Sequence, residues 1–196
     1  MAKARIAPNP LPSQAFLASI LDYNPLTGRL VWKARTPDMF HDGPQSAQHR
    51  CAKWNARYAG TEAFSAVAHG YRHGTINYQK VLAHRVIWKL VTGDDPVEID
   101  HIDGSASNNS WANLRSVSRG ENCRNLAMNK RNTSGHNGVL LVGGKWVAQG
   151  CVRANSKYLG SFSNIETAIA ARKRWEVENG FHANHGRQNA SSQKGK

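Results

Sequence analysis

The segment 98–125 contains side chains that together could hydrolyse a phosphodiester. Such a reaction requires an activated water, neutralisation of the phosphate charge and help for the leaving oxygen. His101 could be the general base, because a neutral imidazole accepts a proton near neutral pH. Asp100 and Asn122 offer carboxylate and amide oxygens, which are hard ligands for a divalent ion. Asn113 could hydrogen-bond across a hairpin and fix the loop that holds His101.

Short elements must position these groups. Val97–Ile102 predicts a strand, the polar segment after it predicts a loop, and Asn113–Val117 predicts a returning strand. Ser118 and Glu121 form a capping-box signature for a following helix, whose first turn presents Asn122. The sequence therefore predicts a β-hairpin packed on a helix, with polar groups from all three elements facing one point.

The same residues form a joined motif in three pieces: Asp100-His101, Asn113-Leu114 and Glu121-Asn122-x-x-Asn125. In residue type and spacing this motif resembles that of the HNH endonucleases, specifically the phage and intron homing type that lacks a structural zinc. Segments 23–33, 70–72 and 83–88 resemble the same family. The resemblance thus covers most of residues 20–125.

This resemblance implies an α+β fold with a ββα-metal core, and cleavage of DNA that leaves 5′-phosphate and 3′-hydroxyl ends. It implies that Asp100 and Asn122 bind a divalent ion, magnesium or alternatively manganese, with no structural zinc. It also implies that His101 is the general base and that Asn113 orients it. The family suggests a free-standing mobile element in a phage as the setting.

Several polar residues near the motif have a second, structural interpretation. Asn108 and Asn109 could make turns only, and Asn125 could be structural or functional. A helix at this point would place one of His84 and Arg85 near the core and the other toward phosphate. His84 is more often a satisfied structural histidine, whereas Arg85 could contact the scissile phosphate.

The charge of the chain favours a polyanionic partner. The formal net charge is +13 and the isoelectric point is about 10.1, which suits phosphate contacts and counterion release. Residues 1–118 carry 13 basic and 9 acidic side chains, whereas residues 119–196 carry 13 and 4. The second part is therefore predicted to bind DNA more strongly than the first. Near the motif, we assign Arg85, Arg115 and Arg124 to DNA contacts.

Other features exclude some classes of protein. Cys51, Cys123 and Cys151 are an odd number with no close pair, which predicts neither a disulfide framework nor a zinc site. The apolar stretch Phe16–Leu21 is too short for a signal segment, and no run approaches the length that spans a bilayer. We expect a cytoplasmic protein, in the host cytoplasm if it is phage-encoded, with no membrane partner.

The C-terminal region has a different pattern. It predicts strands at 138–142, 145–153 and 156–162, followed by a helix from a capping box at Ser163 to about Gly180. Residues 134–187 resemble the ethylene-response-factor (Apetala-type) DNA-binding domain through these pieces: Ser134-Gly135, Gly138-Val139, Gly144-Lys145-Trp146, Tyr158-Leu159-Gly160-Ser161-Phe162 and Glu166-x-Ala168. In that family a three-stranded sheet lies in the major groove.

Strand alternation assigns the faces of this sheet. Trp146 and Ala148 would pack on the helix, and the opposite face would meet DNA. The side chains that we assign to DNA are Lys145, Gln149, Arg153, Lys157 and Tyr158.

Elsewhere the pattern is simpler. A helix is predicted from Ser13 to Leu21, a turn and strand within 23–32, and a helix over 81–91 that Gly93 ends. The sequence makes no prediction for residues 34–57.

The predicted organisation is a nuclease region at 1–125 with its ββα-metal core at 97–125, a linker at 126–133, a DNA-binding domain at 134–187 and a basic polar tail at 188–196. The predicted function is that of a metal-dependent DNA endonuclease, targeted to double-stranded DNA by its C-terminal domain and acting as a monomer or homodimer. One alternative is a sequence-specific DNA-binding regulator with an inactive nuclease region. Another is an RNA-binding protein, against which the lack of exposed aromatic strands of the RNA-recognition type counts.

Overall fold

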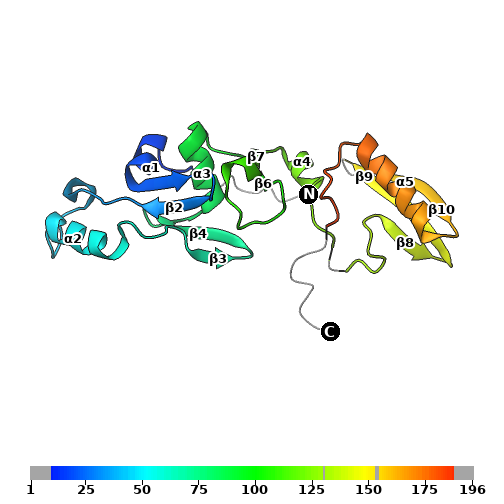
Figure 1. The fold of residues 1–196 in the computed structure, drawn as a ribbon, viewed down its shortest axis with the longest axis horizontal. Coiled ribbons are helices and arrows are strands. Elements are labelled where there is room, and N and C mark those ends of the chain that lie inside the picture. Colours follow the sequence, from blue (N-terminus) through cyan, green and yellow to red (C-terminus); the bar gives the residue numbers. More distant parts are fainter. Residues whose placement is uncertain (1–9, 130, 153–154, 188–196) are drawn as a thin grey trace. The chain divides into compact units, whose positions relative to one another are not determined.

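The computed structural model describes residues 10–129, 131–152 and 155–187. The chain divides into two compact units (Figure 1). The first unit holds residues up to His101 together with Ser105–Ser116, and the second holds Ile102–Gly104 together with the residues from Val117 onward.

Both units mix helices with short antiparallel strands, which confirms the predicted α+β class. The chain divides between residues 102 and 117, whereas the sequence predicts a linker at 126–133. The functional domain limits drawn from the sequence stay a prediction. The predicted tail at 188–196 lies outside the described residues. Among the helices that the structure describes, none is both long and apolar enough to cross a bilayer.

The first unit contains helices α1 (Gln14–Ile20), α2 (Ala47–Tyr58) and α3 (Ala83–Thr92), the 3-10 helices η1 (Pro37–Met39) and η2 (Trp111–Asn113), and strands β1 (Leu21–Asn24), β2 (Arg29–Trp32), β3 (Ala66–Ala68), β4 (Tyr71–Ile76), β5 (Gln79–Leu82), β6 (Ile99–His101) and β7 (Leu114–Ser116). The strands form the hairpin β1–β2, the meander β3–β4–β5 and the hairpin β6–β7.

Two predicted helix ends are confirmed. The Ser13 side chain caps α1 by accepting a hydrogen bond from the Phe16 amide. Gly93 ends α3 in the left-handed conformation, with φ of 84°, which glycine adopts without steric cost.

Two local predictions need correction. The helix α3 begins at Ala83, not Val81, because Val81 and Leu82 pair with β4. The segment before the first turn is also a strand, β1, which pairs with β2. Residues 34–57, for which the sequence made no prediction, contain η1 and most of α2; the latter is capped by Ser46.

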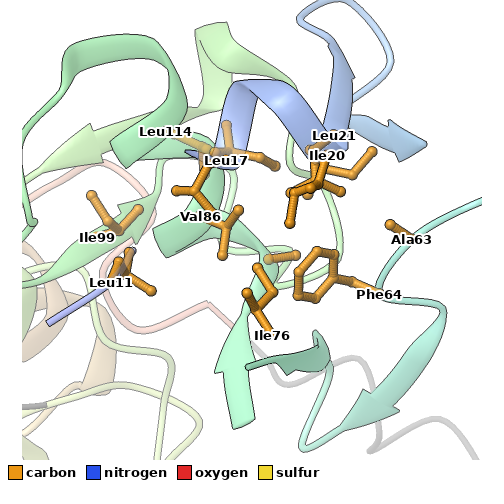
Figure 2. Packing of buried hydrophobic residues seen from close by; sticks show 13 residues of the cluster. Leu11, Leu17, Ile20, Leu21, Ala63, Phe64, Ile76, Val86, Ile99 and Leu114 are labelled. Carbon is orange, nitrogen blue, oxygen red and sulfur yellow. The ribbon is translucent and has the colours of Figure 1, made fainter. Parts of the chain in front are cut away.

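The core of the first unit gathers apolar side chains from segments far apart in the sequence (Figure 2). Leu17 and Ile20 of α1 and Val86 of α3 are fully buried, and Phe64 and Ile76 pack in the same cluster. Complete burial of such a side chain contributes about 1.5–3 kcal/mol. This core therefore fixes α3 and the strands that carry the candidate site.

The second unit contains α4 (Arg119–Cys123), β8 (Val139–Val142), β9 (Lys145–Val152), β10 (Asn155–Phe162) and α5 (Ile165–Glu178). The sheet has the order β10–β9–β8, and α5 packs against it (Figure 1). Three strands followed by one helix confirm the predicted secondary structure of this region. Ala148 is fully buried whereas its neighbour Gln149 is exposed, so the predicted alternation along β9 is also confirmed.

The helix α5 begins one residue later than predicted. Its N-cap is Asn164, whose side chain accepts a hydrogen bond from the Glu166 amide at 2.6 Å. Ser163 is therefore not the cap, and the predicted capping box is wrong here. Asparagine is itself a strong N-cap residue, which explains the shift.

Candidate active site

The hairpin β6–β7 carries the first candidate residue, Asp100. Its register pairs Asp100 with Arg115 across the two strands. Arg115 donates from Nε and Nη2 to Asp100 Oδ2 at 2.9 and 2.6 Å, and the carboxylate is nearly buried. A charge-assisted pair of this kind holds the carboxylate in one orientation. Arg115, which the sequence assigns to DNA, thus contacts a proposed metal ligand.

The imidazole of His101 is buried, with 4% of its surface exposed. Its Nε2 lies 3.1 Å from Asn109 Oδ1. This contact and the burial of the ring hold the imidazole in one orientation. Asn109 is 2% exposed and orients the ring, a contact that the turn-only interpretation of Asn109 missed. Its spacing of eight residues from the histidine gave no signal of this contact.

Asn113 fixes the loop between the two strands. Its Nδ2 donates to the Asn108 carbonyl at 2.8 Å, and it lies in η2, not in the returning strand as predicted. The residue that the sequence selected to hold the loop therefore contacts that loop directly. The ring contact to His101 comes from the adjacent loop residue, Asn109.

The hairpin β1–β2 supports the same loop from outside the motif. Tyr23 donates from its hydroxyl to the Asn109 carbonyl at 2.9 Å, and the Trp111 amide donates to the Pro25 carbonyl at 2.9 Å. Burial raises the pKa of Tyr23 to about 12, so the hydroxyl stays protonated and can donate. The β1–β2 hairpin therefore fixes a loop that lies more than 80 residues further along the chain.

His84 lies beside His101, a position that the sequence left open. The two rings are 5.2 Å apart in an edge-to-face arrangement, and Tyr71 packs 5.9 Å from the His101 ring. Burial, followed by electrostatic interaction with His101 and Arg85, lowers the pKa of His84 to about 3. His84 is therefore neutral near pH 7 and does not offer a cation to a phosphate.

Arg85 is half-buried and bound to the backbone. Its Nη1 donates to the Pro96 carbonyl at 2.8 Å, and burial lowers the pKa of its guanidinium. This contact ties α3 to the segment that leads into β6. Its assignment to DNA stays a prediction.

The helix α4 belongs to the second unit. Ser118 caps it in a complete capping box with Glu121, which confirms that prediction. Asn122 lies on this helix and is half-buried, and its role as a metal ligand stays a prediction. Asn125 is buried and accepts a hydrogen bond at its Oδ1 from Arg187 Nη1 at 3.2 Å, which favours the structural interpretation. Arg124 is half-buried, and its carbonyl accepts from the His182 amide.

The chemistry of the proposed ligands fits a hard divalent ion. Asp100 offers a carboxylate and Asn122 an amide oxygen, and magnesium is usually bound by one or two carboxylates while it keeps several waters. In the described part of the chain, no group of three or more His, Cys, Asp and Glu side chains could hold a metal.

The sheet of the second unit presents a polar face. Gln149 of β9 pairs with Tyr158 of β10, so the two exposed side chains share one face with Lys145. Lys157 pairs with Gly150, where an added Cβ would meet the Trp175 ring of α5.

Lys157 therefore lies on the helix side of the sheet, apart from the other three DNA candidates. Arg153, the fifth DNA candidate, lies outside the described residues.

Comparison with known families gives a match for one part of the chain. Residues 81–124 match the family model of the HNH endonucleases, which covers α3, the β6–β7 hairpin and α4. No curated protein and no solved structure matches the chain. The family match supports a nuclease, and with it a phosphodiester hydrolase with a DNA substrate, and such nucleases commonly use a divalent metal ion.

Proposed function

We propose that the chain is a metal-dependent DNA endonuclease of the homing type, targeted by its C-terminal sheet. The observation that carries the proposal is the match of residues 81–124 to the HNH endonucleases, which includes a buried histidine with an oriented ring.

His101 takes the proton from the attacking water. The contact between its Nε2 and Asn109 Oδ1 holds the buried ring in one orientation, and a neutral imidazole held in this way can accept the proton. Asn113 acts through the loop, because it fixes Asn108 and, with it, the neighbouring Asn109. Asn109 and Asn113 therefore position the base and do not themselves touch the phosphate.

Asp100 and Asn122 are the proposed ligands of the divalent ion. When bound, the ion would neutralise charge on the phosphate and stabilise the leaving oxygen. Arg115 holds the Asp100 carboxylate through Oδ2, so this ligand does not need to find its orientation on binding. Magnesium is the proposed ion, and oxygen ligands would also accept manganese.

The second unit supplies affinity and register. Lys145, Gln149 and Tyr158 lie exposed on one face of the sheet, where a lysine suits a phosphate and a glutamine suits an adenine edge. We propose that this face, of the ethylene-response-factor type, lies in the major groove of the target. Bound DNA would then be held at a high local concentration for the nuclease region.

The test is cleavage of supercoiled plasmid and phage DNA by the purified chain, with magnesium, with manganese and with EDTA. We expect nicked or linear products only when a divalent ion is present, with 5′-phosphate and 3′-hydroxyl ends. DNA binding without cutting under any ion, on DNA that includes a selected binding site, would favour a regulator with an inactive nuclease region. A preference for single-stranded RNA would favour the RNA-binding alternative.

A further inference from the structure

The first unit contains a pocket that neither the motif nor the proposed function uses. Its volume is about 930 Å³, within the range of pockets that bind small ligands. It lies among β2, η1, α2 and the turn between β4 and β5. The side chains that matter for its chemistry are Trp32, Arg35, Phe40, Arg50, Trp54 and Tyr58.

Aromatic rings form one wall of this pocket. The Trp54 ring lies 5.8 Å from Trp32, edge to face, and 5.3 Å from Tyr58. Phe40 extends the same cluster, with its ring 6.5 Å from that of Trp54. All four side chains keep some exposure and line the pocket. The Trp32 ring is stacked on the buried Phe64 at 5.6 Å, so a flat ligand would reach the exposed parts of the Trp54, Tyr58 and Phe40 rings.

Two guanidinium groups lie at the same wall. The Arg35 guanidinium lies over the Trp54 ring at 4.0 Å and near the Trp32 ring at 5.5 Å. Its Nε is buried and has no hydrogen-bond acceptor, and burial lowers the pKa of the group. Arg50 donates from Nη1 to the His41 carbonyl at 2.6 Å.

The charge of the pocket lining is unbalanced. Asp38 is the one carboxylate among the lining residues, against the guanidinium groups of Arg35 and Arg50. Within the described residues, no ion pair joins either arginine to an acidic side chain. A desolvated guanidinium beside aromatic faces is suited to an anion that also carries a planar ring.

We propose that this pocket binds one unstacked nucleotide of a DNA single strand, with the base on the aromatic wall and a phosphate at Arg35 and Arg50. The proposal rests on the proposed function for the identity of the nucleic acid. Single-stranded sites combine basic side chains with aromatic stacking surfaces, and both features are present here. A quaternary ammonium ligand does not fit, because Arg35 would repel it from the rings.

A purely structural role for Arg35 makes a different prediction. In that case the guanidinium only packs on Trp54, and no ligand changes the surroundings of the ring. The two interpretations therefore separate on a signal from Trp54 itself, measured in the intact chain.

The experiment is ¹⁹F NMR of the full-length protein labelled with 5-fluorotryptophan, in EDTA so that no cleavage occurs. Single Trp→Phe variants assign the resonances. Trp88 and Trp111 report on the first unit outside the pocket, and Trp146 reports on the C-terminal sheet. The ligands are a thymidine tetranucleotide, the same backbone without bases, thymidine monophosphate and inorganic phosphate.

We expect the tetranucleotide to shift the Trp32 and Trp54 resonances saturably. The abasic strand should bind these sites at least about fivefold more weakly, because each stacked base contributes measurably. Saturation by thymidine monophosphate at similar concentration would assign the site to a free nucleotide and overturn the single-strand proposal. A shift confined to Trp146, or equal shifts with inorganic phosphate or the abasic strand, would also overturn it.

Arg35→Gln provides the matched test of the guanidinium. We expect about a tenfold higher dissociation constant for the tetranucleotide at Trp54, since a hydrogen bond to a charged group is lost. Lys53→Gln removes the same charge from an exposed position of α2 outside the pocket and should leave that constant unchanged. Equal effects of the two variants would contradict the proposal. Because the titration needs no catalysis, a failure of cleavage alone would leave this result intact.

Discussion

Gly28 lies in the turn between β1 and β2 and approaches the loop that holds His101. Its φ is +72°, and a Cβ added there would lie 2.4 Å from the Asn109 carbonyl carbon and 2.5 Å from the Ser110 nitrogen. Ordinary van der Waals contact begins at 3.4 Å, so the loop backbone would have to retreat by about 1 Å. The substitution Gly28→Ala therefore tests whether the hairpin β1–β2 positions the loop that holds the proposed base.

The expected loss has two parts. Alanine in the left-handed conformation costs about 1 kcal/mol. The forced movement of the loop adds about 1–3 kcal/mol, as other overpacked sites do. We expect urea unfolding to show a loss of about 2–4 kcal/mol in the first unit. Single-turnover cleavage should slow about 100-fold, because the proposed base would be displaced by about 1 Å.

Gly60→Ala is the matched control. Gly60 also has a positive φ, +77°, but no atom lies within 4 Å of an added Cβ, so only the backbone cost of about 1 kcal/mol applies. If Gly28→Ala destabilises the protein no more than Gly60→Ala, the close approach does not constrain the loop. If stability falls as expected but cleavage is unchanged, the loop does not position the base.

Three further predictions follow from other buried groups. Glu176 is 5% exposed and binds Arg172 and Lys173 at 2.9 Å each. Glu176→Ala should therefore lower the unfolding free energy of the second unit by about 3–5 kcal/mol, measured by urea unfolding, because it leaves a buried charge unpaired. A loss under 1 kcal/mol would show that Arg172 is solvated in the variant. Asn113→Ala removes the donor to Asn108 and should slow cleavage at least tenfold while DNA affinity, measured by anisotropy, is unchanged; equal losses in both would point to general misfolding. Burial lowers the pKa of His84 to about 3, so the unfolded chain binds a proton at this histidine more tightly than the folded chain does. The free energy of unfolding is therefore highest above a pH of about 6.5 and decreases as the pH falls toward 3. Between pH 6.5 and 5 the expected decrease in unfolding free energy is about 2 kcal/mol. This decrease should disappear in His84→Gln and persist in a variant of the exposed His49. If unfolding free energy changes with pH in His84→Gln as it does in the unmodified chain, the prediction is refuted.

Local signals predicted much of the secondary structure. The Ser13 and Ser118 caps, the glycine that ends α3 and the three strands of the second unit each depend on a few neighbouring residues. Errors arose where pairing at a distance decided the outcome. Val81 and Leu82 have apolar side chains at helical spacing, yet their backbone pairs with β4 and they form a strand.

The candidate site was predictable only in part. The motif selected Asp100, His101 and Asn113 as candidates from their types and spacing, and their roles stay predictions. The contacts of Asn109 and His84 with the imidazole were not predictable, since they depend on how the loop and α3 fold around it. No periodicity in the sequence encodes such contacts.

The most direct test of the nuclease is cleavage by His101→Ala, compared with a His49→Ala control on the exposed face of α2. Both variants should bind DNA as the unmodified chain does, and metal-dependent cleavage should fall by about 10²- to 10⁴-fold in His101→Ala only, because the general base is lost. Cleavage by His101→Ala at the rate of the control would contradict the role of His101 and, with it, the assignment of this site.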